Sequence, residues 1–210
     1  MIGIIICCCY KYYKNYELCY EKWKNIIVAY PFINFFFIFG TPGSTNYDEN
    51  THVLQLDVDD DYDSLPKKIC KAYQFIMDNY PHIEGIFKTD DDIDFTNNCG
   101  LVLELVMALQ NGDNYCGIFI DKTRPMKICT ARLKKFNNLK SNIIYSHDGA
   151  IYCHGAGYYI SKKSAMYICS NIEYVSYRHL EDVTIGYILN KYGIFPTQLY
   201  SECREIPRII

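Results

Sequence analysis

The 210-residue sequence predicts a single α/β domain in which helices flank a mostly parallel sheet. Apolar segments of strand length alternate with segments of helical periodicity along the whole chain. Half of the residues are hydrophobic and 21% are charged, a composition that can bury a core. The length suits one domain, and neither a repeat nor a low-complexity tract divides it. We therefore expect one domain over residues 1–210.

Short apolar runs bounded by polar or turn-forming residues predict the strands. The run at 32–39 is closed by a Gly-Thr-Pro-Gly-Ser loop, and the run at 53–58 alternates apolar and polar residues. In chain order, strands are expected at residues 2–9, 32–39, 53–58, 83–87, 115–120 and 151–160.

Helical periodicity predicts the segments that connect these strands. In the strongest helix, residues 65–80, apolar side chains recur every three or four positions, Ser64 stands at the N-cap position, and Pro81 ends the run. Residues 122–142 carry most of the local basic charge and predict no regular element. The other helices are expected at residues 16–27, 101–109, 162–169 and 183–190.

The composition argues against two classes of partner. With 21 basic and 24 acidic residues, the chain has a net charge of −3 and no basic excess for nucleic acid. The longest nearly apolar stretch, residues 26–39, is interrupted by Pro31 and Asn34 and is shorter than the roughly 18 residues of a membrane span. The 11 cysteines lack zinc-site spacing. We expect reduced thiols, no leader or membrane anchor, and a cytoplasmic location.

Three consecutive acids, Asp90, Asp91 and Asp92, follow the predicted strand 83–87 after two residues. Adjacent carboxylates repel one another, so a fold keeps them together where a cation or solvent relieves the repulsion. Ligands of open α/β sheets bind at the carboxyl ends of strands. Carboxylate oxygens favour Mg²⁺ or Mn²⁺, which bridge phosphates. These acids therefore predict a divalent ion that holds a diphosphate, whereas the acidic run at 57–63 is expected to be a solvated turn.

A second acidic pair, Glu181 and Asp182, precedes the predicted helix 183–190. Acids in a first turn complement the helix dipole, and the same dipole keeps a carboxylate ionised as a base toward a hydroxyl. Gly155 and Gly157 flank Ala156 in the predicted strand 151–160. Such glycines either let the backbone approach a ligand or relieve tight packing, and the residues alone leave both readings open.

Taken in order, these motifs resemble the β-1,3-glycosyltransferases, which include galactosyltransferases, N-acetylglucosaminyltransferases and the Fringe proteins. The resemblance covers roughly residues 55–190. It rests on four blocks: Asp63-Ser64 with Lys71 eight residues after Asp63, the segment from Lys88 to Ile93 that contains the DxD motif, the glycine-rich stretch from Tyr152 to Tyr158 with Ser161, and the segment from Glu181 to Gly186.

This resemblance implies a nucleotide-binding domain of the GT-A type and a metal-dependent, inverting transfer from a UDP-sugar. A hexose or N-acetylhexosamine would move to a hydroxyl of a glycan, glycoprotein or glycolipid, in β-1,3 linkage. Asp182 would be the base, with Glu181 as the second candidate. The cofactor would be Mn²⁺ or Mg²⁺, held by Asp90, Asp92 and Glu202. The implied nucleotide-binding residues are Asp90, Asp91, Lys71, Lys88, Gly155 and Gly157.

Two departures from the family pattern leave other functions open. The arginines expected before Trp23 are missing, and no His follows His179, so Glu202 stands in for a C-terminal metal ligand. A catalytically silent relative that binds a nucleotide or a partner protein is the main alternative. A phosphatase resembling the haloacid-dehalogenase enzymes is the other, because Asp90 and Asp92 follow an apolar strand, although Asp94 stands where Thr or Val is expected.

Overall fold

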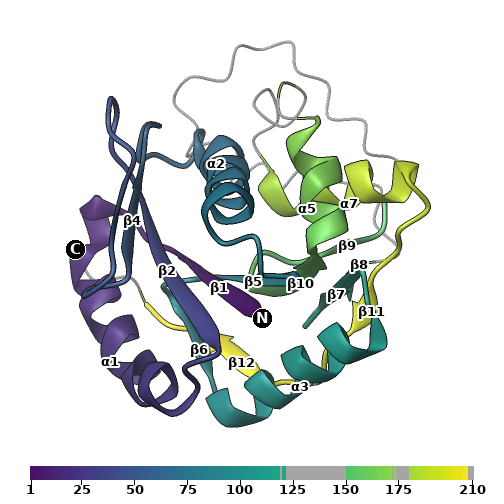
Figure 1. Cartoon of the computed structure of the whole chain (residues 1–210), viewed down its shortest axis with the longest axis horizontal. Helices are drawn as coiled ribbons and strands as arrows, with labels where there is room; N and C mark the ends of the chain where they lie inside the picture. Colours follow the sequence, from purple (N-terminus) through teal and green to yellow (C-terminus); the bar gives the residue numbers. More distant parts are fainter. Residues whose placement is uncertain (119, 122–149, 172, 174–179, 208–210) are drawn as a thin grey trace.

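The computed structural model describes residues 1–118, 120–121, 150–171, 173 and 180–207. The main strands are β1 (Ile2–Cys7), β2 (Ile33–Gly40), β3 (Asn46–Asp48), β4 (Val53–Leu56), β5 (Gly85–Asp90), β7 (Tyr115–Gly117), β10 (Gly157–Ser161) and β11 (Thr197–Gln198). They form one sheet in the order β11-β7-β10-β5-β1-β2-β4-β3 (Figure 1). Strand pairs β1–β2, β1–β5, β2–β4 and β7–β11 are parallel, while β3 and β10 run antiparallel to their neighbours. The predicted α/β class with a mostly parallel sheet is confirmed.

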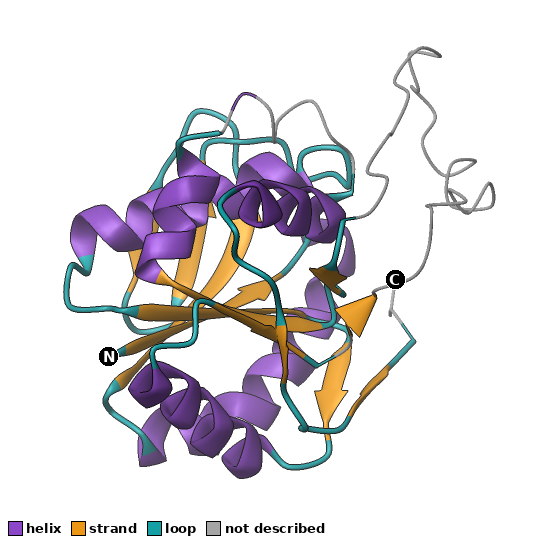
Figure 2. Ribbon diagram, turned by 90° about the vertical axis from the view of Figure 1, so that its right-hand side faces the viewer, coloured by secondary structure: helices purple, strands orange, loops and turns teal. Residues whose placement is uncertain are grey.

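Helices cover both faces of this sheet (Figure 2). One face packs against α2 (Leu65–Asn79), α5 (Lys162–Cys169) and α7 (Glu181–Lys191). The other face packs against α1 (Tyr13–Ala29) and α3 (Asn98–Asn111). Because side chains alternate along a strand, Ile86 of β5 joins the first core and Phe87 joins the second. Both faces are thus apolar, which explains why the strands read as nearly continuous hydrophobic runs.

The parallel strands place their carboxyl ends along one edge of the sheet. In the β1–β5 pair, Cys7 stands opposite Asp90, and in the β2–β4 pair Gly40 stands opposite Leu56. The short 3₁₀ helix η1 (Tyr10–Tyr12) follows β1 at this edge. The three consecutive acids therefore lie at the strand ends, as predicted, although β5 continues to Asp90 because its pairing with β1 extends that far.

The single strand expected at residues 151–160 is divided into two, and that prediction is corrected here. β9 (Tyr152–Cys153) pairs with β8 (Ile120–Asp121) in a separate ladder, and β10 pairs with β5 and β7. Between them, the carbonyl groups of Gly155 and Ala156 accept hydrogen bonds from Lys88 and Thr89 at 2.9 and 2.7 Å. These side chains of β5 hold the intervening turn outside the regular ladder.

The remaining helices and strands follow the predictions at their centres and differ at their ends. α1 begins three residues before the expected helix, and α3 begins after Asn97, whose side chain accepts a hydrogen bond from Gly100 N–H. A second small sheet, β6 (Ile93–Phe95) with β12 (Cys203–Glu205), was not predicted because each strand has only three residues. The predicted irregular segment 122–142 lies outside the described residues.

The cysteines of the described residues are free thiols, and six of them are buried. Burial raises the pKa of Cys7 to about 12, so this thiol stays protonated and acts as an apolar core side chain. Among the described residues, no helix is both long and apolar enough to span a membrane.

Candidate active site

Three segments meet at the carboxyl edge of the sheet: the end of β5, the turn at residues 154–156, and the first turn of α7. Lys88 connects them. Its ammonium group lies 2.7 Å from Asp90 Oδ1 and 3.7 Å from Glu181 Oε2, and it donates a 2.9 Å hydrogen bond to the Gly155 carbonyl. The Lys88 side chain is 1% exposed. A buried cation therefore holds an acid from β5 and an acid from α7 in one corner.

The peptide of Gly155 continues this connection to Asp182. Its N–H donates to Asp182 Oδ2 at 3.1 Å, while Asp182 Oδ1 accepts from Val183 N–H at 2.8 Å. A Cβ at position 155 would be in ordinary contact with Lys88 Nζ at 3.4 Å, Glu181 Oε2 at 3.7 Å and Asp182 Oδ2 at 3.8 Å, so the three charged groups surround this position. The half-buried Asp182 carboxylate is thus fixed at the start of α7.

Glu181 is buried beneath this turn, with Oε2 near Lys88 and Gly155 and Oε1 toward the core. It is 3% exposed, and its Oε1 accepts a hydrogen bond from the Tyr158 hydroxyl, which lies 3.0 Å from the Tyr73 hydroxyl. A carboxylate enclosed in this way cannot meet a substrate hydroxyl, which argues against Glu181 as the alternative base. Instead it is a partner for Lys88.

Burial sets the protonation of this pair. Burial raises the pKa of Glu181 from 4.5 to about 7, and the Lys88 charge only partly opposes the shift. For Lys88, burial alone would lower the pKa, but the carboxylates of Asp90 and Glu181 outweigh it and the net pKa is raised. Lys88 therefore remains a cation at neutral pH.

The raised pKa of Glu181 predicts a pH-dependent stability. Between pH 4.5 and about 7 the folded protein keeps a proton that the unfolded chain releases. The stability from this group is fully present below pH 4.5 and is lost as the pH rises toward 7. Relative to Glu181→Gln, the free energy of unfolding of the native chain should fall by roughly 3 kcal/mol over this range. Urea denaturation at several pH values measures this difference, and a difference that is constant or grows with pH would contradict it.

Asp90 and Asp92 are the two accessible carboxylates of the predicted cation site. Asp90 is partly exposed and Asp92 is half-buried on the adjoining turn, whereas Asp91 is buried and its N–H donates to the Cys7 carbonyl. Among the described residues, no three His, Cys, Asp or Glu side chains converge on one point. A magnesium-like ion uses one or two carboxylates and takes its other ligands from phosphate oxygens and water. Two accessible carboxylates meet that requirement.

Glu202 does not lie beside these two acids. Its carbonyl accepts from Thr96 N–H, while Ile206 N–H donates to the Asp92 carbonyl. The β6–β12 ladder therefore separates Glu202 from Asp92 by four residue positions, or about 13 Å along the strand. The predicted third metal ligand is displaced because the register of this ladder could not be read from the sequence.

Three of the predicted nucleotide-binding residues contact other parts of the protein. Lys88 is enclosed by protein carboxylates, as described above. Gly157 lies within β10, where an added Cβ would contact Phe87 and Ile118, so it relieves packing inside the sheet. Lys71 forms a 3.3 Å ion pair with Asp57 after β4. It lies at the same edge as Asp90, but three strand spacings away, about 14 Å.

A second buried ion pair at this edge was not predicted. Lys68 is 4% exposed and contacts Asp60 Oδ1 and the Cys8 carbonyl, both at 2.8 Å. Asp60 also accepts from Tyr10 N–H and Gly40 N–H, so it joins the ends of β1 and β2. The acidic run is therefore not merely a solvated turn. The available signal was Lys68 itself, a cation on the apolar face of α2, which requires a buried acid as partner.

Comparisons with known proteins identify the family of this chain. Over 183 residues the chain is 27% identical to beta-1,3-galactosyltransferase 5 of Mus musculus, in a match that covers 82% of this chain and 57% of that protein. The chain thus spans less than two thirds of the length of this relative. The profile of the galactosyltransferase family matches residues 22–200, a range that contains the Asp90 and Asp182 segments. This protein belongs to the galactosyltransferase family.

Proposed function

We propose that this chain is a metal-dependent, inverting glycosyltransferase that moves a hexose or N-acetylhexosamine from a UDP-sugar to an acceptor hydroxyl in β-1,3 linkage. The observation that carries the proposal is the chain of contacts from Asp90 through Lys88 and Gly155 to Asp182. It brings a partly exposed acid at the strand end and a half-buried acid at the start of α7 into one corner of the fold. Family membership supports glycosyl transfer over a phosphatase reaction.

Asp182 is the proposed base. Its carboxylate takes the proton of the acceptor hydroxyl, and the resulting oxygen attacks the anomeric carbon from the side opposite UDP. The bond from that carbon to the UDP oxygen breaks, and UDP leaves with the electron pair. Two backbone N–H groups, from Gly155 and Val183, orient the carboxylate, so little side-chain rearrangement precedes proton transfer.

Asp90 and Asp92 are the proposed ligands of Mn²⁺ or Mg²⁺. When bound, the cation stabilises the negative charge that develops on the leaving diphosphate. Lys88 holds the Asp90 carboxylate in place through the 2.7 Å ion pair. Lys71 lies about 14 Å from Asp90 along the edge of the sheet. It would contact the nucleoside end of a donor that covers the ends of β5, β1, β2 and β4.

The acceptor is proposed to be a glycan, free or attached to protein or lipid. The mouse relative is named as a beta-1,3-galactosyltransferase, which supports a hexose as the transferred group. The donor sugar is tested by screening UDP-sugars for hydrolysis stimulated by Mn²⁺, a reaction that needs no acceptor. Hydrolysis of one UDP-sugar above all others supports the proposal, and no stimulation with any of them contradicts it.

Asp92→Asn provides the direct test of the metal site. Loss of one of two carboxylate ligands should weaken UDP-dependent Mn²⁺ binding by roughly tenfold or more, measured by calorimetry. Asp94→Asn is the matched control, because Asp94 lies two residues on and pairs with Lys22 and Arg204 at the surface. Equal Mn²⁺ affinity in both variants would remove Asp92 from the metal site.

A catalytically silent relative is the second candidate, and one observation favours it. Glu202 lies away from Asp90 and Asp92, and no third acid or His joins them among the described residues. A silent relative would bind UDP without hydrolysing any UDP-sugar. The donor screen combined with a UDP titration therefore separates the two functions.

A further inference from the structure

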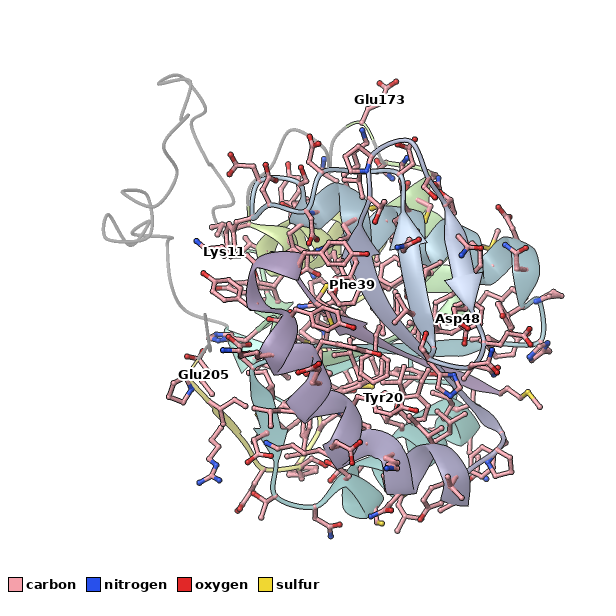
Figure 3. The ribbon with its side chains drawn as sticks, turned by 90° about the vertical axis from the view of Figure 1, so that its left-hand side faces the viewer. Lys11, Tyr20, Phe39, Asp48, Glu173 and Glu205 are labelled. Carbon is pink, nitrogen blue, oxygen red and sulfur yellow. The ribbon has the colours of Figure 1, made fainter. Side chains whose placement is uncertain are left out.

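A pocket of about 320 Å³ lies outside the candidate active site, on the face of the sheet that α1 covers. Its lining residues come from η1, the start of α1, and strands β2, β3 and β4. Figure 3 shows Phe39 between α1 and the strand that carries Asp48. The residues used in the argument below are Tyr10, Tyr13, Phe39, Asp48, Thr51 and Gln55.

Strand register explains why the pocket is apolar at one side and polar at the other. Phe39 of β2 stands opposite Gln55 of β4, and Gln55 stands opposite Asn46 of β3. Residues in register share a face of the sheet, so these side chains form one row. Along this row, the Phe39 ring lies next to α1, and the amide groups of Gln55 and Asn46 lie farther from the helix.

Aromatic rings form the wall next to α1. The Tyr10 ring stacks on Phe39 with centroids 4.5 Å apart, and the Tyr13 ring lies 6.1 Å from Phe39. Tyr10 is held at both ends, because its N–H donates to Asp60 at 2.6 Å and its hydroxyl accepts from Gln55 Nε2 at 3.0 Å. Both tyrosines are nevertheless more than 40% exposed. These contacts hold Tyr10 in place, and both rings are accessible to solvent.

The opposite side offers hydrogen-bonding groups and one negative charge. Asp48 accepts from Asn50 N–H at 2.9 Å and from the Thr51 hydroxyl at 2.8 Å. These bonds, that of Thr51 first, lower the pKa of Asp48, which stays ionised at neutral pH. None of the residues that line the pocket is Lys or Arg. A phosphate or another anion would meet no cation here, and a purely apolar ligand would leave the Asp48 carboxylate without water.

We propose that this pocket is a non-catalytic saccharide site that holds one neutral pyranose ring. The C–H face of a pyranose suits the negative face of the accessible Tyr13 ring. Its hydroxyl groups can donate to Asp48 and exchange hydrogen bonds with the Gln55 amide. The volume is at the lower end of the range for small-ligand sites, which suits a single ring.

This saccharide site is separate from the proposed base and from the proposed cation ligands. Gln55 lies on β4, three strand spacings from β5, and it faces α1, whereas Asp182 lies on α7 at the opposite face. The pocket therefore does not depend on the proposed transfer reaction. A pyranose bound here could belong to the same glycan chain as an acceptor or to a neighbouring glycan.

The test measures saccharide binding without UDP or metal. Methyl β-galactoside, methyl β-glucoside and methyl β-N-acetylglucosaminide are titrated by ligand-observed NMR against the native chain, Tyr13→Ala, Gln55→Ala and Asp182→Asn. Tyr192→Ala is the matched control, because Tyr192 and Tyr13 are both 46% exposed and Tyr192 stacks on Tyr167 elsewhere. At least one glycoside should bind the native chain and Asp182→Asn equally, and roughly tenfold more weakly to both pocket variants.

Three results would overturn this proposal. The first is the absence of binding by all three glycosides. The second is binding that persists in Tyr13→Ala and Gln55→Ala but is lost in Asp182→Asn, which would place the sugar at the strand ends. The third is displacement of the glycoside by tetramethylammonium at equal concentration, which would make the pocket a cation site. Circular dichroism of each variant confirms that the fold is retained.

Discussion

Asp182→Asn is expected to reduce sugar transfer by about 10²- to 10⁴-fold, the range typical of a lost general base. The amide oxygen of Asn can replace only one of the two carboxylate oxygens, so the hydrogen bond from either Gly155 N–H or Val183 N–H is lost. The substitution therefore removes the charge that accepts the acceptor proton together with one of the two orienting hydrogen bonds. The measurement is kcat for transfer, with UDP affinity determined by calorimetry on the same protein.

Asp78→Asn is the control for this substitution, because Asp78 is exposed on α2, away from the three segments of the candidate active site. It should retain both transfer and UDP affinity. For Asp182→Asn, a fall in kcat with unchanged UDP affinity identifies a group that acts in the transition state. If kcat is retained, Asp182 is not the base. If UDP affinity falls in parallel with kcat, the substitution has disturbed the donor site instead.

The placement of these acids could be predicted from the sequence because it follows from local rules. Asp90 comes two residues after a short apolar run, and parallel strands bring such ends to one edge of a sheet. Asp182 comes directly before a helical pattern, where acids complement the dipole. Neither inference requires knowledge of which strands are neighbours, and the structure brings both residues to the same corner of the fold.

The contacts that join them could not be predicted, because they depend on pairings between distant segments. Lys88 reaches Gly155 only because β10 pairs antiparallel with β5 and brings residues 67 positions apart together. The register of β6 with β12, which moves Glu202 away from Asp92, joins segments more than 100 residues apart. In both cases hydrophobic patterning indicates that a strand exists but not which residue stands opposite.

Lys88→Met is expected to lower the free energy of unfolding by about 3–5 kcal/mol above pH 7, where Glu181 is ionised beside Lys88 and would become a buried acid without its cation. Glu181 is enclosed in the core, and Lys88 is the cation within 4 Å of it. Transfer should also fall, because the Gly155 carbonyl and the Asp90 carboxylate both lose the group that holds them. Urea denaturation and kcat are the two measurements.

Lys71→Met is the matched control. Lys71 also pairs with an aspartate near the end of a strand, but its side chain is 26% exposed and Asp57 is 53% exposed. A pair of this kind contributes at most about 1 kcal/mol. A similar loss of stability in Lys71→Met and Lys88→Met would show that burial of the Lys88 pair has no special effect.

The double variant Lys88→Met with Glu181→Gln separates the two roles of Lys88. If the cost of Lys88→Met is the uncompensated Glu181 charge, neutralising that acid should recover part of the stability, so the two substitutions should not be additive. Transfer should not recover, because neither change restores a donor to the Gly155 carbonyl or a partner to Asp90. Recovery of kcat together with stability would mean that Lys88 serves only to fold the chain. Continued loss of kcat in a stable protein would make Lys88 a positioning residue that links the proposed metal site to the proposed base.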